Sequence, residues 1–370
     1  MPQRKIPYLN LDTINGPLLA SFQELTAEVF KNSNYINGVF CKQFEQAYAA
    51  YSGTGFCSGV SNGLDALILS LTALGIGPGD EVIVPAHTYI ATWLAVTHTG
   101  ATIVPVDCDL LTYNIDVNLI EDKITSRTKV IIPVHLYGLP CDMGAIMAIA
   151  AKHNLFVLED NAQAQGATVN NQKTGSFGNI NATSFYPGKN LGAIGDAGAV
   201  TSNSQELYYR VVELKNYGST IKYQHNRIGY NNRLDELQAA FLSLKLPLLD
   251  SYNYQRRAIA SAYNSLLAGI GGLVLPTEPA GTKHVYHIYS IRTNMRDALQ
   301  QYLQNNGIQT LVHYPIPPYI QKAYLGMGIA AGAYPNADEV AKTCLSLPIY
   351  PGLSDEDVDY VASVIKTFFS

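Results

Sequence analysis

The sequence has few charged residues, no long apolar run and no basic cluster. Charged side chains make up 14% of the 370 residues, and 24 Lys and Arg against 29 Asp and Glu give a net charge of −5. An acidic chain without a basic run has no electrostatic means of holding a nucleic acid polymer. No apolar stretch approaches the roughly 20 residues that span a bilayer, and the first residues lack the apolar core of a secretion signal. We therefore expect neither nucleic acid nor membrane as a partner.

Cysteine is also scarce, and the five cysteines form no C-x-x-C pair. An odd number without paired spacing argues against a disulfide framework and against a structural zinc site. Free thiols in a reducing cytoplasm are the expected state of Cys41, Cys57, Cys108, Cys141 and Cys344.

Apolar residues, by contrast, make up 47% of the chain, and there are 25 tyrosines. This supply of apolar side chains is enough for a buried core and excludes a disordered chain. The length fits one large domain and one smaller domain. Low charge also suggests that a partner subunit covers part of the surface.

Short apolar runs alternate with helical patterns in the first two thirds of the chain. This alternation predicts an α/β fold with a large, mostly parallel sheet and helices on its faces. Ligand sites on such sheets lie beyond the carboxyl ends of the strands. We expect helices over 64–74, 89–98 and 143–153, and strands over 82–84, 103–106, 129–134 and 156–158.

The pattern changes near residue 250. A long helix over 251–267, an alternating strand over 287–292 and a helix over 295–306 predict a smaller α+β domain. Ser354 opens a final amphipathic helix with a capping box. We therefore divide the chain into a large domain, 1–250, and a small domain, 251–370.

Three segments near predicted strand ends contain candidate functional residues. Ser61-Asn62-Gly63-Leu64-Asp65 can bind an anion at a helix start, or can simply cap that helix. Glu159 and Asp160 follow an apolar strand, where a carboxylate can hold a cationic ring nitrogen, cap a helix or bind magnesium. Lys189 lies in an apolar, Gly-rich context in which a desolvated lysine forms Schiff bases, although most lysines are solvated surface charges.

Together these motifs resemble the sugar aminotransferases of the DegT/DnrJ/EryC1/StrS family, which are fold-type I pyridoxal phosphate enzymes. The resemblance runs nearly end to end and depends on four motifs occurring in one order. They are Ser61-Asn62-Gly63, Glu159-Asp160-Asn161-Ala162-Gln163, Ser184-Phe185-Tyr186-Pro187-Gly188-Lys189-Asn190, and the segment Gly229 to Ala240.

The resemblance assigns roles on pyridoxal 5'-phosphate. Lys189 would form a Schiff base with the cofactor and then act as the base of the proton shift. Asp160 would keep the pyridine nitrogen protonated, which makes the ring an electron sink. Gln163 would donate to the phenolic oxygen of the ring.

The resemblance also names residues around the cofactor phosphate and ring. Gly63, Leu64 and Ser184 would hold the phosphate, with Leu64 standing where the family usually has Thr. Tyr89 would stack on the ring. Asn231 would reach the phosphate of the neighbouring subunit, so that a homodimer shares its active sites.

The substrate implied by the resemblance is a nucleotide-linked keto sugar, with L-glutamate as the amino donor. The run from Tyr186 to Gly192 and the segment Val312-His313-Tyr314-Pro315 are similar to those of members that aminate 3-keto sugars. We therefore expect a dTDP-linked 3-keto-6-deoxyhexose, converted to a dTDP-3-amino-3,6-dideoxyhexose for deoxysugar and cell-surface polysaccharide biosynthesis. The expected substrate-binding residues, each with a packed or solvated role as the alternative, are Tyr186, Tyr217, Lys222, His313 and Tyr314.

Other functions remain open at this stage. A C-4 aminotransferase shares the same chemistry, and a regulator that binds the cofactor without catalysis belongs to a different class. A sugar dehydratase of this fold would carry His in place of Lys189. No metal site is expected from His284 and His287, because residues three apart on a strand face opposite sides.

Overall fold

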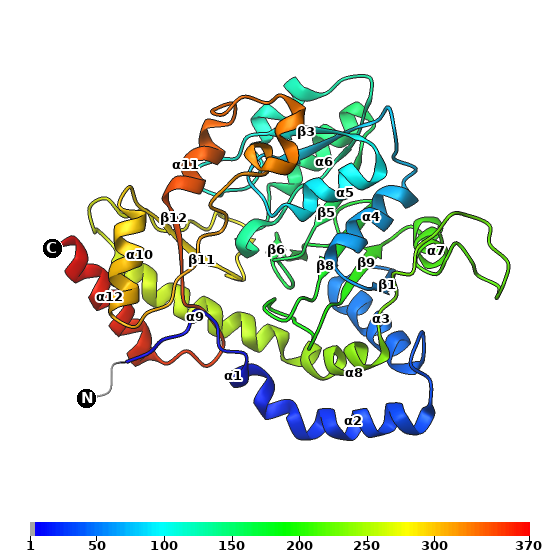
Figure 1. Ribbon diagram of the computed structural model, residues 1–370, viewed down its shortest axis with the longest axis horizontal. Coiled ribbons are helices and arrows are strands. Elements are labelled where there is room, and N and C mark those ends of the chain that lie inside the picture. Colours follow the sequence, from blue (N-terminus) through cyan, green and yellow to red (C-terminus); the bar gives the residue numbers. More distant parts are fainter. Residues whose placement is uncertain (1–3) are drawn as a thin grey trace.

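The computed structural model describes residues 4–370 and is built around a seven-stranded sheet (Figure 1). The strand order is β1-β9-β8-β5-β4-β2-β3, and within this sheet only β9 runs antiparallel to its neighbours. The predicted α/β fold with a mostly parallel sheet is thereby confirmed. The strands are β1 (Phe56–Val60), β2 (Glu81–Pro85), β3 (Thr102–Val106), β4 (Thr128–Ile131), β5 (Phe156–Asp160), β8 (Ile180–Ser184) and β9 (Gly198–Ser202).

Helices cover both faces of this sheet because its strands carry apolar side chains on both sides. In β2, Val82 and Val84 pack into the core beneath α4 and α5, whereas Ile83 packs into the core with α6. The first face is covered by α4 (Gly63–Ala73), α5 (Ala91–Thr99) and α7 (Gln205–Leu214), and the second by α3 (Val39–Ser52), α6 (Met143–His153) and α8 (Glu236–Lys245). Outside these lie α1 (Asp12–Asn15) and α2 (Leu19–Asn32), the latter packed on α8.

A second apolar core lies in the carboxyl-terminal part of the chain. Ile6, from the other end of the sequence, is buried in this core and forms a parallel bridge with Ile308. Figure 1 shows the amino-terminal segment (blue) close to the last helix (red), where Arg4 pairs with Asp357 at 2.6 Å. Ser354 caps the last helix as predicted, its Oγ accepting from the N–H of Asp357 at 3.1 Å. The core is formed by α9 (Leu249–Leu267), α10 (Arg296–Asn305), α12 (Asp355–Phe369), β11 (Tyr289–Arg292) and β12 (Cys344–Leu347).

Part of the carboxyl-terminal region returns to the large sheet. Tyr319 in the 3-10 helix η6 (Pro318–Ile320) and Tyr324 in η7 (Lys322–Met327) are buried in the core beneath α4 and α5. The division into residues 1–250 and 251–370 stays a prediction. The remaining elements are α11 (Pro335–Thr343) and the small sheet of β6 (Thr168–Val169), β7 (Gln172–Lys173) and β10 (Thr282–Lys283).

Two predicted strands are longer than those observed. The strand expected over 129–134 ends at Ile131, two residues before Pro133, which has no N–H for a sheet. The strand expected over 287–292 begins at Tyr289, because the N–H of Ile288 donates to the carbonyl of Tyr137 at 3.2 Å instead of to a strand partner. Within residues 4–370 no group of three or more His, Cys, Asp or Glu side chains could hold a metal ion, and no helix is long and apolar enough to cross a membrane.

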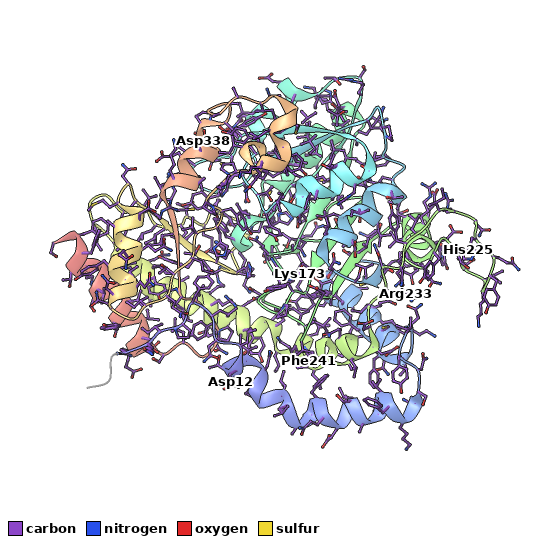
Figure 2. All side chains as sticks on the ribbon, viewed as in Figure 1. Asp12, Lys173, His225, Arg233, Phe241 and Asp338 are labelled. Atoms are coloured by element: carbon purple, nitrogen blue, oxygen red, sulfur yellow. The ribbon has the colours of Figure 1, made fainter. Side chains whose placement is uncertain are left out.

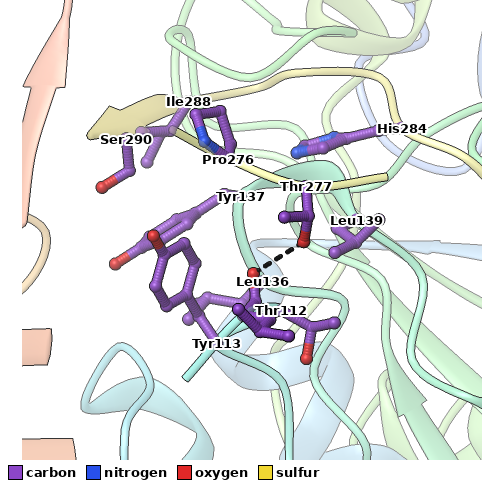
Figure 3. Close-up of a pocket in the computed structure, with 11 residues that line it drawn as sticks. Thr112, Tyr113, Leu136, Tyr137, Leu139, Pro276, Thr277, His284, Ile288 and Ser290 are labelled. Carbon is purple, nitrogen blue, oxygen red and sulfur yellow. Dashed lines mark hydrogen bonds between the residues drawn. The ribbon is translucent and has the colours of Figure 1, made fainter. Parts of the chain in front are cut away.

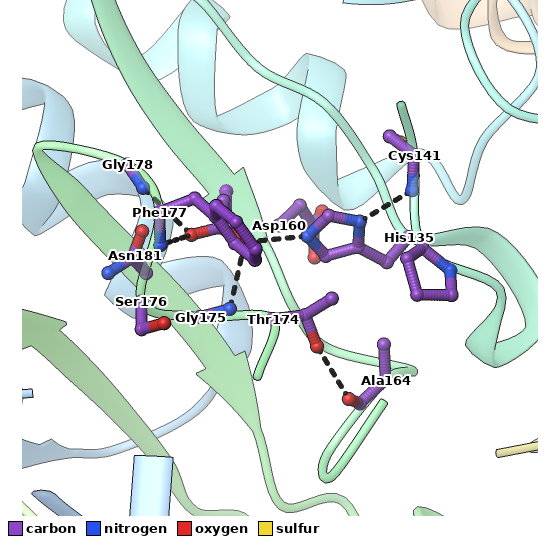
Figure 4. A network of polar contacts seen from close by, with 12 residues as sticks. His135, Cys141, Asp160, Ala164, Thr174, Gly175, Ser176, Phe177, Gly178 and Asn181 are labelled. Atoms are coloured by element: carbon purple, nitrogen blue, oxygen red, sulfur yellow. Dashed lines mark hydrogen bonds and ion pairs between the residues drawn. The ribbon is translucent and has the colours of Figure 1, made fainter. Parts of the chain in front are cut away.

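Glu159, near the end of β5, organises the edge of the sheet that faces the candidate site. Figure 4 shows this polar network with His135, Gly175, Phe177 and Gly178. Its side chain is fully buried beside His135, and its two oxygens accept four hydrogen bonds. The donors are the backbone N–H groups of Gly175 (2.8 Å), Phe177 (2.6 Å) and Gly178 (2.8 Å) and Nε2 of His135 (2.8 Å). One carboxylate therefore holds two loops against the end of β5.

These contacts also fix the backbone of Asp160. The N–H of Asp160 donates to the carbonyl of Pro133 at 2.8 Å, and its carbonyl accepts from the N–H of His135 at 3.2 Å. Because both neighbours of this peptide belong to the loop that Glu159 holds, Asp160 is presented from a rigid support. Glu159 therefore has a structural role, which removes it from the candidates for the chemistry.

We expect Glu159→Gln to lower the free energy of unfolding by about 3 kcal/mol. The amide would keep one acceptor oxygen but would place an NH₂ group against N–H donors that have no alternative partner. Thermal unfolding followed by circular dichroism measures the change.

Glu206→Gln is the matched control, because Glu206 is exposed and pairs only with Arg210 one helical turn away. We expect this control to change the stability by less than about 0.5 kcal/mol. Equal midpoints for the two variants would contradict the role assigned to Glu159.

Candidate active site

The amino terminus of α4 lies against the end of β8. Asn62 caps the helix, its Oδ1 accepting from the N–H of Asp65 at 2.8 Å, so the capping hypothesis is correct for this residue. The N–H groups of Gly63 and Leu64 stand in the first turn, where a helix offers no acceptor. A Cβ on Gly63 would lie 2.6 Å from Cβ of Ser184, so glycine is what allows this close approach. Two N–H donors, one hydroxyl and the positive end of a helix therefore meet, which suits a phosphate.

Asp160 is buried at the end of the central strand β5. Its Oδ2 accepts from Oγ1 of Thr92 at 2.9 Å, and Oδ1 accepts from the N–H of Ala162 at 3.2 Å. Burial raises the pKa of Asp160, while these hydrogen bonds and the charge of Lys189 oppose the rise. A buried carboxylate of this kind is poised to hold a cationic partner.

Lys189 lies in the loop between β8 and β9. Burial lowers the pKa of its amine to about 8, and the negative charge of Asp160 opposes this shift. The next residue, Asn190, fixes the loop by donating to Oδ1 of Asn253 at 2.8 Å and to the carbonyl of Val285 at 3.1 Å. A lysine with a lowered pKa on a rigid loop has the properties of a Schiff-base nucleophile.

Gln163 is hydrogen-bonded to the first of two tyrosines whose rings lie together. Its Nε2 donates to the hydroxyl of Tyr314 at 2.9 Å, and the ring of Tyr314 lies 5.4 Å from that of Tyr89. His313 belongs to the same group, with Nδ1 2.8 Å from Oγ of Ser346. The structure thus brings together Tyr89, Gln163, His313 and Tyr314 on one side of the site.

Other predicted residues lie apart from this group within one chain. Tyr186 is on the Lys189 loop and is 59% exposed. Tyr217, Lys222 and Asn231 are on a segment that projects from the body, with His225 near its tip (Figure 2). Tyr217 donates through its N–H to the carbonyl of Tyr230 at 2.7 Å, and its ring lies 5.4 Å from the guanidinium carbon of Arg233.

The residues present fit pyridoxal phosphate. The glycine-lined cradle at Gly63 and Ser184 suits a phosphate, the buried Asp160 suits a protonated ring nitrogen, and Lys189 suits an aldehyde carbon. These three kinds of group are the ones that the cofactor requires.

Sequence reasoning missed two residues of the site, Thr92 and Tyr137. Thr92 stands in the same motif as Tyr89, and Tyr137 follows a predicted strand, which was the criterion used for the other segments.

Comparison with known proteins agrees with this chemistry. Residues 19–366 match the model of the DegT/DnrJ/EryC1/StrS aminotransferase family. The chain is 48% identical over 363 residues to dTDP-3-amino-3,6-dideoxy-alpha-D-galactopyranose transaminase of Aneurinibacillus thermoaerophilus, covering 98% of this chain and 99% of that protein. It is 46% identical over 349 residues to dTDP-3-amino-3,4,6-trideoxy-alpha-D-glucose transaminase of Streptomyces venezuelae, covering 94% and 92%.

The fold is also similar to the folds of solved structures. The crystal structure of S. venezuelae DesV in complex with a ketimine intermediate has a TM-score of 0.97 at 45% identity, covering 99% of both chains. Solved structures of related proteins from Bacillus subtilis and Streptococcus pneumoniae carry pyridoxal phosphate or its amine form. The chain therefore belongs to the DegT/DnrJ/EryC1/StrS aminotransferase family and is a fold-type I transaminase that uses pyridoxal phosphate.

Proposed function

We propose that the protein transfers the amino group of L-glutamate to C-3 of a dTDP-linked 3-keto-6-deoxyhexose, giving a dTDP-3-amino-3,6-dideoxyhexose. The observation that carries this proposal is identity of 46–48% to two transaminases named for dTDP-3-amino sugars. The geometry supports it, because the charge of Lys189 reaches His313, which lies beside Tyr314, and such groups stack on a base and hydrogen-bond to hydroxyls. We place the reaction in the cytoplasm, where the five unpaired thiols would stay reduced.

The residues of the site have separate roles in transamination. The bound cofactor supplies an electron sink that stabilises negative charge on the substrate carbon. Asp160 holds a proton on the ring nitrogen, and Thr92 keeps the carboxylate oriented. Nζ of Lys189, neutral at a moderately alkaline pH, takes the proton from the amino-bearing carbon of glutamate in the first half-reaction. In the second half-reaction it delivers a proton to the sugar carbon that receives the amino group. Gly63, Leu64 and Ser184 hold the phosphate and so fix the ring.

The sugar side of the site would be formed by three residues of the same chain. His313 and Tyr314 lie beside Gln163, and the exposed ring of Tyr186 lies on the Lys189 loop. Hydroxyl and imidazole groups suit the hydroxyls of a hexose.

We infer that a second copy of the chain completes each site. The projecting segment 216–231 exposes Ile221 (59%), Tyr223 (83%) and Ile228 (96%), which is unusual for apolar side chains that face water. In a homodimer this segment would bring Asn231 to the partner's cofactor phosphate and would bring Tyr217 and Lys222 to its substrate. Lys222 would then neutralise the pyrophosphate.

A substrate panel tests the proposed reaction. We expect turnover with 3-keto but not 4-keto dTDP sugars in the presence of L-glutamate, with the aminated carbon identified by NMR. Lys189→Ala should reduce turnover by at least about 1,000-fold because it removes the base, whereas Lys173→Ala, which changes a lysine outside the site, should not. Amination at C-4 would overturn the proposed carbon, and cofactor binding without any turnover would favour the regulatory alternative.

The lowered pKa of Lys189 predicts how cofactor uptake depends on pH. Only the neutral amine attacks an aldehyde, so we expect the uptake rate of cofactor-free protein to rise with pH and level off above about pH 8. Stopped-flow absorbance measures the rate. Asp160→Asn removes the charge that favours the protonated amine, so the midpoint should move to lower pH. A midpoint of the uptake rate near pH 10, or an upward shift of that midpoint in Asp160→Asn, would contradict this prediction.

Mixed dimers test the shared site. Lys189→Ala and Asn231→Asp should each inactivate a homodimer, the second because its carboxylate repels the phosphate. A heterodimer of the two, purified through two different tags, would keep one intact site of two and about half the wild-type activity. Heterodimers no more active than the single variants would show that Asn231 acts within its own chain.

A further inference from the structure

Tyr137 makes contacts with both sides of the active site, although the proposed reaction assigns it no role. It is buried in the 3-10 helix η4 (Leu136–Gly138). Its backbone N–H donates to Oε1 of Gln163 at 2.6 Å, and its hydroxyl donates to the carbonyl oxygen of His313. One residue therefore joins the group that faces the cofactor ring to the group that faces the sugar.

The backbone of Tyr137 is held in an uncommon conformation. Its φ of +59° is left-handed, which is rare for a residue with a side chain. Gly138 is left-handed as well, and a Cβ there would lie 2.9 Å from Cγ2 of Val285 and 3.1 Å from the carbonyl oxygen of Gln163. Packing against these neighbours maintains the turn and directs the N–H of Tyr137 at Gln163.

His87 supports the hydroxyl of Tyr137 from the other side. Its Nε2 lies 3.1 Å from that oxygen. The single hydroxyl hydrogen of Tyr137 is donated to His313, so the hydrogen-bond pattern assigns the shared proton to Nε2 of His87. Burial lowers the pKa of His87 to about 4, which keeps the ring neutral at physiological pH. His87 is therefore a fixed neutral donor to the oxygen of Tyr137.

The contacts form a closed path around the His313–Tyr314 peptide. Tyr137 binds the carbonyl of His313 directly, and it also orients Gln163, whose Nε2 donates to the hydroxyl of Tyr314 at 2.9 Å. We propose that Tyr137, supported by His87, is a positioning residue that fixes the His313–Tyr314 segment relative to Gln163 and so aligns the sugar with the cofactor ring. The sugar-binding part of this inference rests on the proposed function.

Tyr137→Phe tests the inference, with Tyr113→Phe as the matched control. The two buried rings stand side by side, 5.6 Å apart, in the wall of one small cavity (Figure 3). Each variant removes one phenol oxygen, but the hydroxyl of Tyr113 interacts with Arg292 instead of His313. We expect Tyr137→Phe to raise KM for the keto sugar about tenfold with the glutamate half-reaction changed less than about twofold. Tyr113→Phe should leave both unchanged.

Hydrogen–deuterium exchange gives a readout that needs no substrate. Because the carbonyl of His313 would lose its hydroxyl donor and keep only the weak Sγ–H donor of Cys344 at 3.4 Å, amide exchange over residues 311–316 of the holoenzyme should become at least about tenfold faster in Tyr137→Phe. Tyr113→Phe should leave this segment as protected as in the wild type. Unchanged exchange in Tyr137→Phe would overturn the positioning role.

Two variants of His87 keep the test decisive if Tyr137→Phe folds poorly. His87→Leu removes the donor and should change KM and exchange in the same direction as Tyr137→Phe. His87→Gln places an amide N–H near Nε2 and should restore both. Failure of this rescue, or an equal loss in both half-reactions, would show a merely structural role. If the wild type aminates no keto sugar while exchange behaves as expected, the proposed substrate is wrong and the positioning role stands.

Discussion

The electrostatic attraction between the buried Asp160 and the half-buried Lys189 is the constraint on which the rest of the site depends. A carboxylate and an amine removed from water must each find partners, and each shifts its pKa toward the neutral form if the partners are insufficient. Thr92 and the N–H of Ala162 bind the carboxylate, and the remaining attraction is between the two groups themselves. The hydrogen bonds of Glu159 hold Asp160 in place, and those of Asn190 hold the Lys189 loop in place. Both groups therefore keep their positions during the reaction.

Most of the fold could be predicted because its signals are local. Helix and strand periods around Val82–Val84 and Met143–His153 depend only on neighbouring residues, and the structure has α6 over that same helical range. The three segments chosen at strand ends also lie together, since parallel strands present their carboxyl ends at one edge. The family resemblance then supplied roles for Lys189, Asp160 and Gln163 that spacing alone left open.

The residues that were missed act through contacts between distant parts of the chain. Nothing near Tyr137 in the sequence indicates that its hydroxyl meets His313, 176 residues away. Glu159 looked like a candidate for chemistry because it adjoins Asp160, yet neighbours on a strand face opposite sides and its side chain turns into the loop at Gly175. Two strand lengths were predicted wrongly, for a local reason at Pro133 and because of a long-range hydrogen bond at Ile288.

Ile6 has a consequence for the order in which the chain folds during synthesis. It is buried among residues of the second core, which extends to Ile365, so this core needs both ends of the sequence. The strands of the large sheet lie within residues 56–202, so all of their pairing partners are made before Ile308. Ile6 stays unpaired until Ile308 has been made, and pairing over such a distance in the chain is slow. Gly63 and Ser184 can therefore meet before His313 and Tyr314 arrive.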